Sequence, residues 1–142
     1  MGVDDDLKPM TLRQYRALAD FRYELRRFLR YSEQATRRQR LTPLQYQLML
    51  QIKGYPGRER ASIGEIAERL QAKHHGVVAL VTRCEKAGLV VRRVSDEDRR
   101  AVIVELTPKG ERALERLARQ HRNELLAIQG RLSILPKTQG LE

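Results

Sequence analysis

The sequence predicts a mainly α fold with one small β hairpin (an α+β class) in a chain of 142 residues. Apolar residues recur every three or four positions over residues 11–38 and again over 108–132, which is typical of long amphipathic helices. Between them, residues 89–94 and 101–106 are rich in β-branched side chains with a period of two, which is typical of paired strands. Residues 95–100 are too polar to bury, so they are expected to form the hairpin tip.

A strong helix start lies between the first long helix and the hairpin. Thr42 can cap this helix, Pro43 suits its first position and Gln45 can complete a capping box. Gly54 and the turn residues that follow it are expected to end the helix. The residues expected to face the core are Leu44, Leu48 and Ile52.

Two further helices are predicted before the hairpin. Ser62 and Glu65 form a second capping box, which starts a helix over residues 62–70. After a short break, a helix over 73–87 buries one apolar side and ends at Gly88, which suits the left-handed residue after a last turn. The side of this helix that is expected to be buried consists of Val77, Leu80, Val81 and Cys84.

Two short helices joined by a tight break and followed by a charged hairpin are the pattern of a winged helix-turn-helix. The first short helix supports the second, whose exposed side can enter the major groove of DNA. Arginines at the tip of the hairpin, which forms the wing, can reach the minor groove, where negative potential concentrates. The predicted DNA-binding residues are Lys73, His74, His75, Val78, Ala79, Thr82, Arg83, Arg99 and Arg100.

The wing tip also holds an acidic residue, Asp98, which is predicted to orient the wing by pairing with Arg100. Such a pair leaves Arg99 as the freer candidate for the groove, but the sequence does not decide between the two arginines. The alternative, that Asp98 is only a repulsive surface charge, stays open. Arg92 and Arg93 on the incoming strand add basic charge to the same element.

The excess of positive charge in the chain favours a polyanionic binding partner. The chain has 28 Lys and Arg residues against 18 Asp and Glu residues, and its formal net charge is +10. Nucleic acid is the first candidate and an anionic membrane surface the second. No apolar run approaches the roughly 20 residues that span a bilayer. The acidic first residues lack the apolar stretch of a secretory signal, so we expect a cytoplasmic location.

The sequence shows no catalytic constellation. It has no Ser-His-Asp or Cys-His set, no phosphate-binding glycine loop and no plausible carboxylate pair, so we predict that the protein is not an enzyme and takes no cofactor. Adjacent His74 and His75 point about 100° apart on a helix, with no further ligand at helical spacing, so no metal is expected. Cys84 lies on an apolar stripe and is expected to be an inert core thiol.

Residues 41–113 resemble the MarR family of bacterial transcription regulators. The wing residues Asp98-Arg99-Arg100 are similar to the family's Asp-x-Arg motif, and the long helices at 11–38 and 108–135 are similar in position to its dimerisation helices. The other matching segments are Leu41-Thr42-Pro43, Ile66-Ala67-Glu68-Arg69-Leu70, Glu85-Lys86-Ala87-Gly88-Leu89-Val90 and Leu106-Thr107-Pro108-Lys109-Gly110.

The resemblance implies one domain over 1–142, with residues 41–106 as the winged helix-turn-helix DNA-binding lobe. It further implies a homodimer on a pseudo-palindromic operator in double-stranded DNA, acting as a repressor that a small-molecule effector releases, in the bacterial cytoplasm at the nucleoid. His75, Gly76 and Val78 stand where many members carry Ser or Thr, so base preference does not transfer. Residues that can line an effector pocket, and that serve equally well as core, are Tyr15, Phe21, Tyr23, Tyr46 and His121.

The competing interpretation is a winged helix module that binds nucleic acid without reading its sequence, or that bridges proteins. The chain has two Phe, five Tyr and no Trp. That is a poor supply of the exposed aromatic side chains on which single-strand binders stack bases. The sequence therefore favours a reader of double-stranded DNA.

Overall fold

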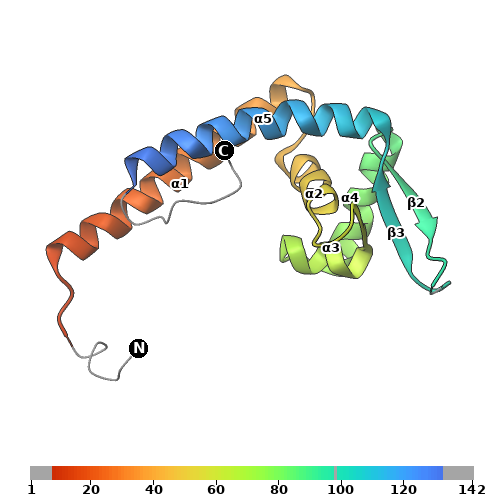
Figure 1. The fold of residues 1–142 in the computed structure, drawn as a ribbon, viewed down its shortest axis with the longest axis horizontal. Helices are drawn as coiled ribbons and strands as arrows, with labels where there is room; N and C mark the ends of the chain where they lie inside the picture. The colour runs from red at the N-terminus through yellow and green to blue at the C-terminus, as the bar shows by residue number, and fades with distance from the viewer. Residues whose placement is uncertain (1–7, 98, 133–142) are drawn as a thin grey trace. The chain divides into compact units, whose positions relative to one another are not determined.

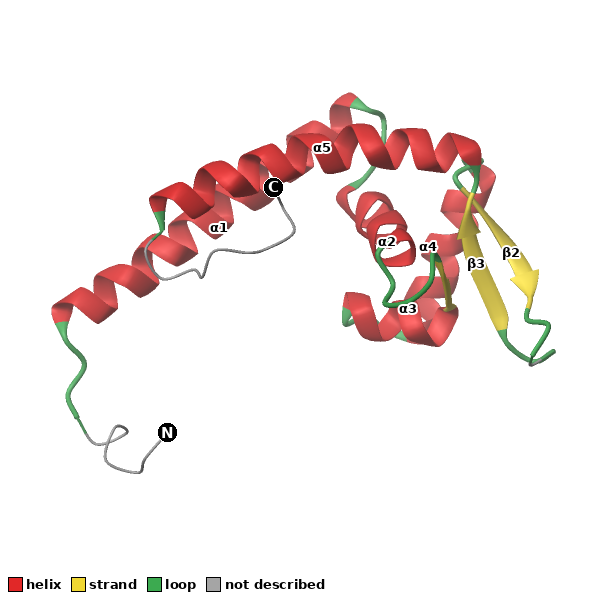
Figure 2. Cartoon of the chain, in the orientation of Figure 1, coloured by secondary structure: helices red, strands yellow, loops and turns green. Residues whose placement is uncertain are grey.

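The structure is a computed structural model that describes residues 8–97 and 99–132. These residues form the elements α1 (Leu12–Arg38), α2 (Pro43–Lys53), β1 (Arg60–Ser62), α3 (Ile63–Leu70), α4 (His74–Lys86), β2 (Val90–Val94), β3 (Val102–Leu106) and α5 (Pro108–Arg131) (Figures 1 and 2). The predicted mainly α fold with a small β element is confirmed. Positions 133–135 of the predicted last helix and the wing residue Asp98 lie outside the described residues.

The chain divides into two compact units. Residues 32–120 form one unit, and the other combines the described residues 8–31 with 121–132. Both long helices contribute to both units, so the single domain over 1–142 stays a prediction. No helix among the described residues is both long and apolar enough to cross a membrane.

Both predicted capping boxes are present. The Thr42 hydroxyl accepts a hydrogen bond from the Gln45 backbone N–H at 3.1 Å, and the Gln45 side chain accepts one from the Thr42 N–H at 2.9 Å. Ser62 and Glu65 repeat these bonds at 3.1 and 2.9 Å. Each box gives partners to backbone donors that a helix start leaves unpaired. The predicted break before α4 lies at Gln71, which is left-handed with φ 51°.

The sheet has a third strand that the sequence analysis missed. β1 pairs antiparallel with β3, and the strand order is β1-β3-β2. Only Ala61 of its three residues is buried. A run with one buried side chain shows no alternation, so the period-two signal was absent.

The core of the 32–120 unit lies where α2, α3 and α4 meet the sheet. α2 buries Tyr46, Leu48, Met49 and Ile52, whereas Leu44 is 54% exposed. The prediction that Leu44 faces the core was therefore wrong, because the buried side of α2 runs through Tyr46 and Met49 instead.

The predicted buried side of α4 is confirmed for Val77, Leu80, Val81 and Cys84. Burial raises the pKa of the Cys84 thiol to about 11, so it stays protonated at neutral pH, as expected for a core thiol.

The start of α5 is fixed against the end of α4 and the start of β2. The Thr107 hydroxyl donates to the Gly88 carbonyl at 2.5 Å and accepts from the Gly110 N–H at 3.0 Å. Gly88 has φ 76°, the left-handed conformation that was predicted. A Cβ atom on Gly110 would overlap the carbonyl oxygen of Leu89. Glycine is therefore required at position 110, where helix and strand backbones meet.

The unit of residues 8–31 and 121–132 holds α1 against α5. His121 is 3% exposed, as expected for a core histidine, and packs edge-on against Phe28 and Tyr31 at ring-centroid distances of 5.8 and 5.7 Å. Arg131 donates to both carboxylate oxygens of Glu24 at 3.1 and 3.0 Å. An aromatic cluster and a two-bond ion pair therefore join the two helices.

Gly110→Ala should destabilise the fold by about 1–3 kcal/mol, because the added methyl group displaces the backbone of Leu89, just before β2. Urea unfolding measures the change. Gly130→Ala, in the same helix, is the matched control: its Cβ meets nothing within 4 Å. It should stabilise the protein by up to about 1 kcal/mol through helix propensity. Equal effects of the two substitutions would contradict the close approach at Gly110.

Glu24→Gln should weaken the fold at pH 7 but not in acid. The hydrogen-bonded Arg131 guanidinium holds the pKa of Glu24 below its ordinary value of 4.5. A carboxylate with a lowered pKa stabilises the folded state above its unfolded pKa, and this contribution disappears as pH falls through the folded pKa. Unfolding titrations should therefore converge for variant and parent at low pH. Glu33→Gln, in an exposed pair with Arg37 on α1, serves as the control, and a constant Glu24→Gln deficit at every pH would refute the linkage.

Candidate nucleic-acid interface

One side of α4 faces solvent with most of the residues that were predicted to contact DNA. Lys73 is the N-cap residue and makes no side-chain capping bond. The other exposed members are His74, His75, Val78, Ala79 and Arg83. They alternate with the buried residues of α4, so the helix presents one polar, small-residue side away from the core.

A hollow of about 560 Å³ separates α4 from the wing. It brings together four of the predicted residues, namely His74, Val78, Thr82 and Arg100. The hollow is also lined by residues that were not predicted to contact DNA: Ser62, Ile63, Gly64, Arg92, Ala101 and Val102. The predicted residues Lys73, His75, Ala79, Arg83 and Arg99 lie outside it.

Arg92 ties the wing to α4. Its guanidinium donates to the Thr82 hydroxyl at 2.7 Å and to the Val78 carbonyl at 3.1 Å, and it pairs with Glu85 at 3.3 Å. The Arg92 backbone N–H also donates to Glu85 at 3.3 Å. The sequence predicted that Arg92 adds basic charge to the wing surface. Its charge is instead used in contacts within the protein.

This network also occupies Thr82. Its hydroxyl donates to the Val78 carbonyl at 3.0 Å while it accepts from Arg92. The alternation of side chains along β2 could have predicted the contact of Arg92 with α4, because Arg92 lies on the same strand face as the buried Val90. That face packs on α4, so an arginine there meets the helix before it meets solvent.

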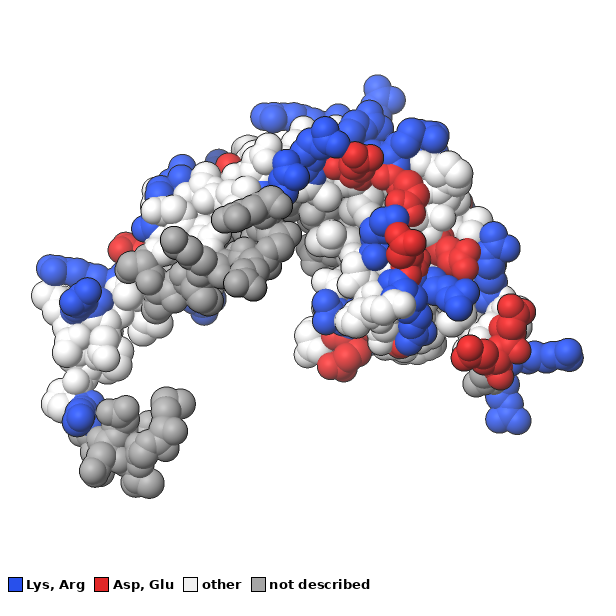
Figure 3. Space-filling model, viewed as in Figure 1, with Lys and Arg blue, Asp and Glu red and all other residues white. Residues whose placement is uncertain are grey.

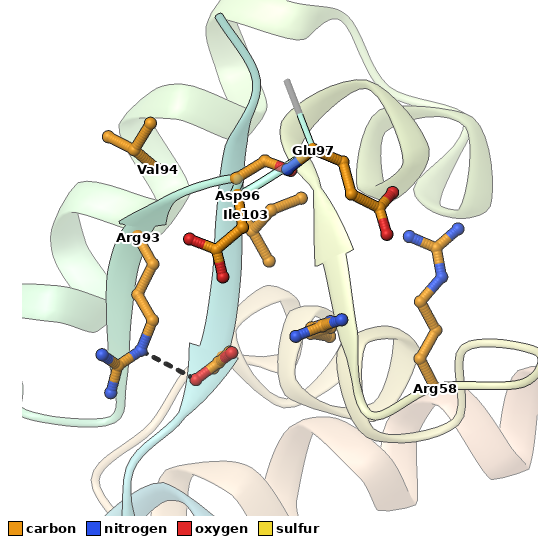
Figure 4. Close-up of a pocket in the computed structure, with 9 residues that line it drawn as sticks. Arg58, Arg93, Val94, Asp96, Glu97 and Ile103 are labelled. Carbon is orange, nitrogen blue, oxygen red and sulfur yellow. Dashed lines mark hydrogen bonds and ion pairs between the residues drawn. The ribbon is translucent and has the colours of Figure 1, made fainter. Parts of the chain in front are cut away.

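Arg93 lies on the opposite face of the sheet, away from α4. It donates to Glu105 on β3 at 2.9 Å. Figure 4 shows this pair at the edge of a pocket of about 360 Å³, where the acidic residues Asp96 and Glu97 lie over the sheet and Glu97 faces Arg58. The acidic side chains that precede the wing tip therefore gather on the face away from α4, whereas Arg100 lines the hollow beside α4.

The wing tip is highly charged. Arg99 and Arg100 are both exposed, and basic and acidic side chains project together from the end of the hairpin in Figure 3. The predicted orienting pair between Asp98 and Arg100 involves a residue outside the described part of the chain. Within residues 8–97 and 99–132, no group of three or more His, Cys, Asp or Glu side chains is placed to hold a metal ion.

Two short helices on a small sheet, with a wing hydrogen-bonded to the second helix, define a winged helix-turn-helix protein. Residues 41–101 match the MarR family. The chain is 36% identical over 76 residues to an uncharacterized HTH-type transcriptional regulator from Bacillus cereus, an alignment that covers 54% of this chain and 48% of the relative. The chain thus spans about half the length of the curated relatives it matches. Residues 41–101 are thus similar to the MarR family, and the matched relative and solved structures are transcriptional regulators.

Solved structures share the fold over most of the chain. AbsC, a MarR family transcriptional regulator from Streptomyces coelicolor, superposes with a TM-score of 0.72 at 21% identity, covering 92% of this chain and 86% of AbsC. A mutant MarR from E. coli, complexed with operator DNA, gives a TM-score of 0.66 at 17% identity and covers 80% of each chain. These likenesses confirm the winged-helix fold.

Arg92→Ala should loosen the wing. Loss of its bonds to α4 should reduce local stability by about 1–2 kcal/mol, so amides of β2 and β3 should exchange roughly 5–30 times faster in hydrogen-exchange measurements. Arg93→Ala is the matched control, because it removes only an exposed pair within the hairpin, worth about 0–1 kcal/mol. Equal exchange rates in the two variants would show that Arg92 does not hold the wing.

Proposed function

We propose that this protein is a sequence-specific regulator of transcription that binds double-stranded DNA as a homodimer on a pseudo-palindromic operator. The observation that carries the proposal is the exposed polar side of α4 beside a wing that Arg92 fixes to the same helix. A helix and wing held in one geometry can enter a major groove and the adjacent minor groove together. The DNA-bound MarR from E. coli, which has the same fold, supports this use of the fold.

In this proposal α4 enters the major groove. His75, Ala79 and Arg83 are exposed at spacings of four residues, so they form one line along the helix. A Cβ atom on Gly76 would meet nothing within 4 Å, so packing within the chain does not require glycine there. Close approach of a DNA backbone accounts for it.

The wing supplies the second contact. Arg99 and Arg100 are exposed at the hairpin tip, and the acidic Asp96 and Glu97 lie on the opposite side of the sheet from α4. This division of charge favours approach of a polyanion to the α4 side. An arginine in a narrow minor groove senses groove width, so A·T-rich flanks are expected to bind better.

The homodimer is proposed from the exposed surface of the first long helix and the residues before it. Large apolar side chains there are 45–62% exposed, an unfavourable state unless a partner covers them. They are Met10, Leu12, Tyr15, Leu18, Tyr23 and Leu29. A homodimer that binds a pseudo-palindromic operator has to place its two α4 helices about one DNA turn apart, roughly 34–36 Å.

The regulator is further proposed to act as a repressor that a small-molecule effector releases, and to work in the cytoplasm at the nucleoid. Similarity to the MarR family, matched over residues 41–101, supports this part of the proposal. Transcription in vitro from a promoter that carries the selected operator tests it. Repression by the purified protein supports the proposal, and activation contradicts it.

Leu18→Glu should dissociate the dimer without unfolding the chain, because Leu18 is 49% exposed within one chain. Light scattering at micromolar concentration should give the dimer mass for the parent protein and a lower mass for the variant. Ala19→Glu adds the same charge at the next, also exposed, position, about 100° around the helix. It should have a smaller effect. A monomeric parent protein would overturn the proposed assembly.

An operator is first selected from a pool of random duplexes. Arg83→Ala should lower the ratio of the affinity for this operator to the affinity for random DNA by about tenfold or more. A bidentate arginine–guanine contact carries about 1–3 kcal/mol of discrimination. Titrations of both duplexes measure this ratio, with the exposed Arg122→Ala on α5 as the control. An equal fall on both duplexes would instead assign Arg83 to phosphate, and unchanged binding to both would remove Arg83 from the interface.

A further inference from the structure

A second basic surface lies outside α4 and the wing. A hollow of about 680 Å³ is formed where the first half of α5 meets the corner between α1 and α2. Its lining residues, named the α5 patch, are Gln39, Arg112, Glu115, Arg116, Arg119 and Gln120. All six belong to the 32–120 unit, and Figure 3 shows basic side chains gathered along α5.

The arginines of this patch are largely available to a partner. Arg119 pairs with Glu115 at 2.6 Å, but Arg112 and Arg116 are exposed and form no ion pair with any other described residue. Arg38 and Arg40, on either side of Gln39 in the sequence, are likewise exposed. The surface therefore holds uncompensated positive charge that the structure does not use for folding.

The chemistry of the lining favours a phosphate backbone over a protein. Every lining residue is Arg, Gln or Glu, whereas the core of a protein–protein interface is largely apolar and enriched in aromatic side chains and Met. No aromatic side chain lines the patch, so nothing there stacks the bases of a single strand. Arg112, Arg116 and Arg119 follow one face of α5, a few ångströms apart, so their guanidinium groups can reach neighbouring phosphates.

The position of the patch leaves it accessible when α4 is occupied. Within the 32–120 unit, α2 packs on α3 and α4 and lies between them and α5 (Figure 1). DNA on the exposed side of α4 and DNA on the α5 patch would therefore approach from different sides of this unit.

We propose that the α5 patch binds the phosphate backbone of a second DNA duplex, so that the protein bridges two DNA segments. The binding is independent of sequence, because arginine–phosphate contacts carry no base information. This inference goes beyond the proposed function, which needs only α4 and the wing.

A two-duplex capture assay tests this inference. The parent protein is bound to an immobilised duplex of about 30 base pairs, roughly three helical turns, and a labelled second duplex of random sequence is then added. Arg112 and Arg116 in the patch and Arg38 and Arg40 beside it, on four phosphates, give a log–log salt slope of about −3.6, so capture should fall roughly 100-fold between 50 and 200 mM salt. Arg112→Glu combined with Arg116→Glu should keep the first duplex and capture at least about tenfold less of the second.

The matched control combines Arg58→Glu with Arg60→Glu, two exposed arginines at the pocket on the sheet face away from α4, and should capture the second duplex as the parent does. Capture that persists in the Arg112 and Arg116 double variant would assign bridging to the two α4 helices of a dimer and overturn the inference. Displacement of the second duplex by poly-glutamate as effectively as by unlabelled duplex would instead identify a protein-docking surface. Binding of one duplex without any second would refute the bridge but leave the proposed function intact.

Discussion

The interaction on which the proposed DNA-binding surface depends is the attachment of the wing to α4 by Arg92. β1 pairs only with residues 103–105 of β3, so the outer part of the hairpin is two-stranded, which is marginally stable alone, and its charged tip adds nothing that packs. Arg92 reaches across from β2 to the Thr82 hydroxyl at 2.7 Å and to the Val78 carbonyl at 3.1 Å, and it also pairs with Glu85. Since Val78 and Thr82 also line the hollow beside the wing, the same contacts set the shape of that hollow.

Ion pairs within the chain neutralise some of its arginines and leave others exposed. Arg92 and Arg93 neutralise glutamates on opposite faces of the wing. Arg83 and Arg99 remain exposed. A chain with a net charge of +10 would attract polyanions over its whole surface if every cation were free. Internal pairing removes the charge of Arg92 and Arg93 from the wing surface, whereas exposed arginines remain on α4, the wing tip, the α5 patch and α1.

Local signals in the sequence predicted most of the elements, because each signal involves residues close together in the chain. The capping boxes at Thr42 and Ser62 are three-residue patterns, and the buried stripe of α4 is a helical period. β1 and the exposure of Leu44 were not predicted, because each depends on partners distant in sequence. The side on which α2 meets the core leaves Leu44 out, and β1 is defined only by its pairing with β3.

The sequence likewise predicted some features of the candidate site and missed others. Helical phase placed His75 and Arg83 on the exposed side of α4, and the polar run between the strands placed Arg99 at the tip. The role of Arg92 was missed because composition treats every arginine as surface charge, whereas its strand face turns it toward α4. The choice between base and phosphate for Arg83 depends on the DNA and not on the fold.

The measurement that tests this account most directly is a double-mutant cycle between Arg92 and Arg99 on duplex affinity. If Arg92 fixes the wing, Arg99→Ala costs less affinity in an Arg92→Ala background, because an unattached wing must be ordered before its arginine can bind. The double variant should therefore lose less binding free energy than the sum of the two single losses. Strict additivity would contradict this coupling, because the wing would then act independently of its attachment to α4.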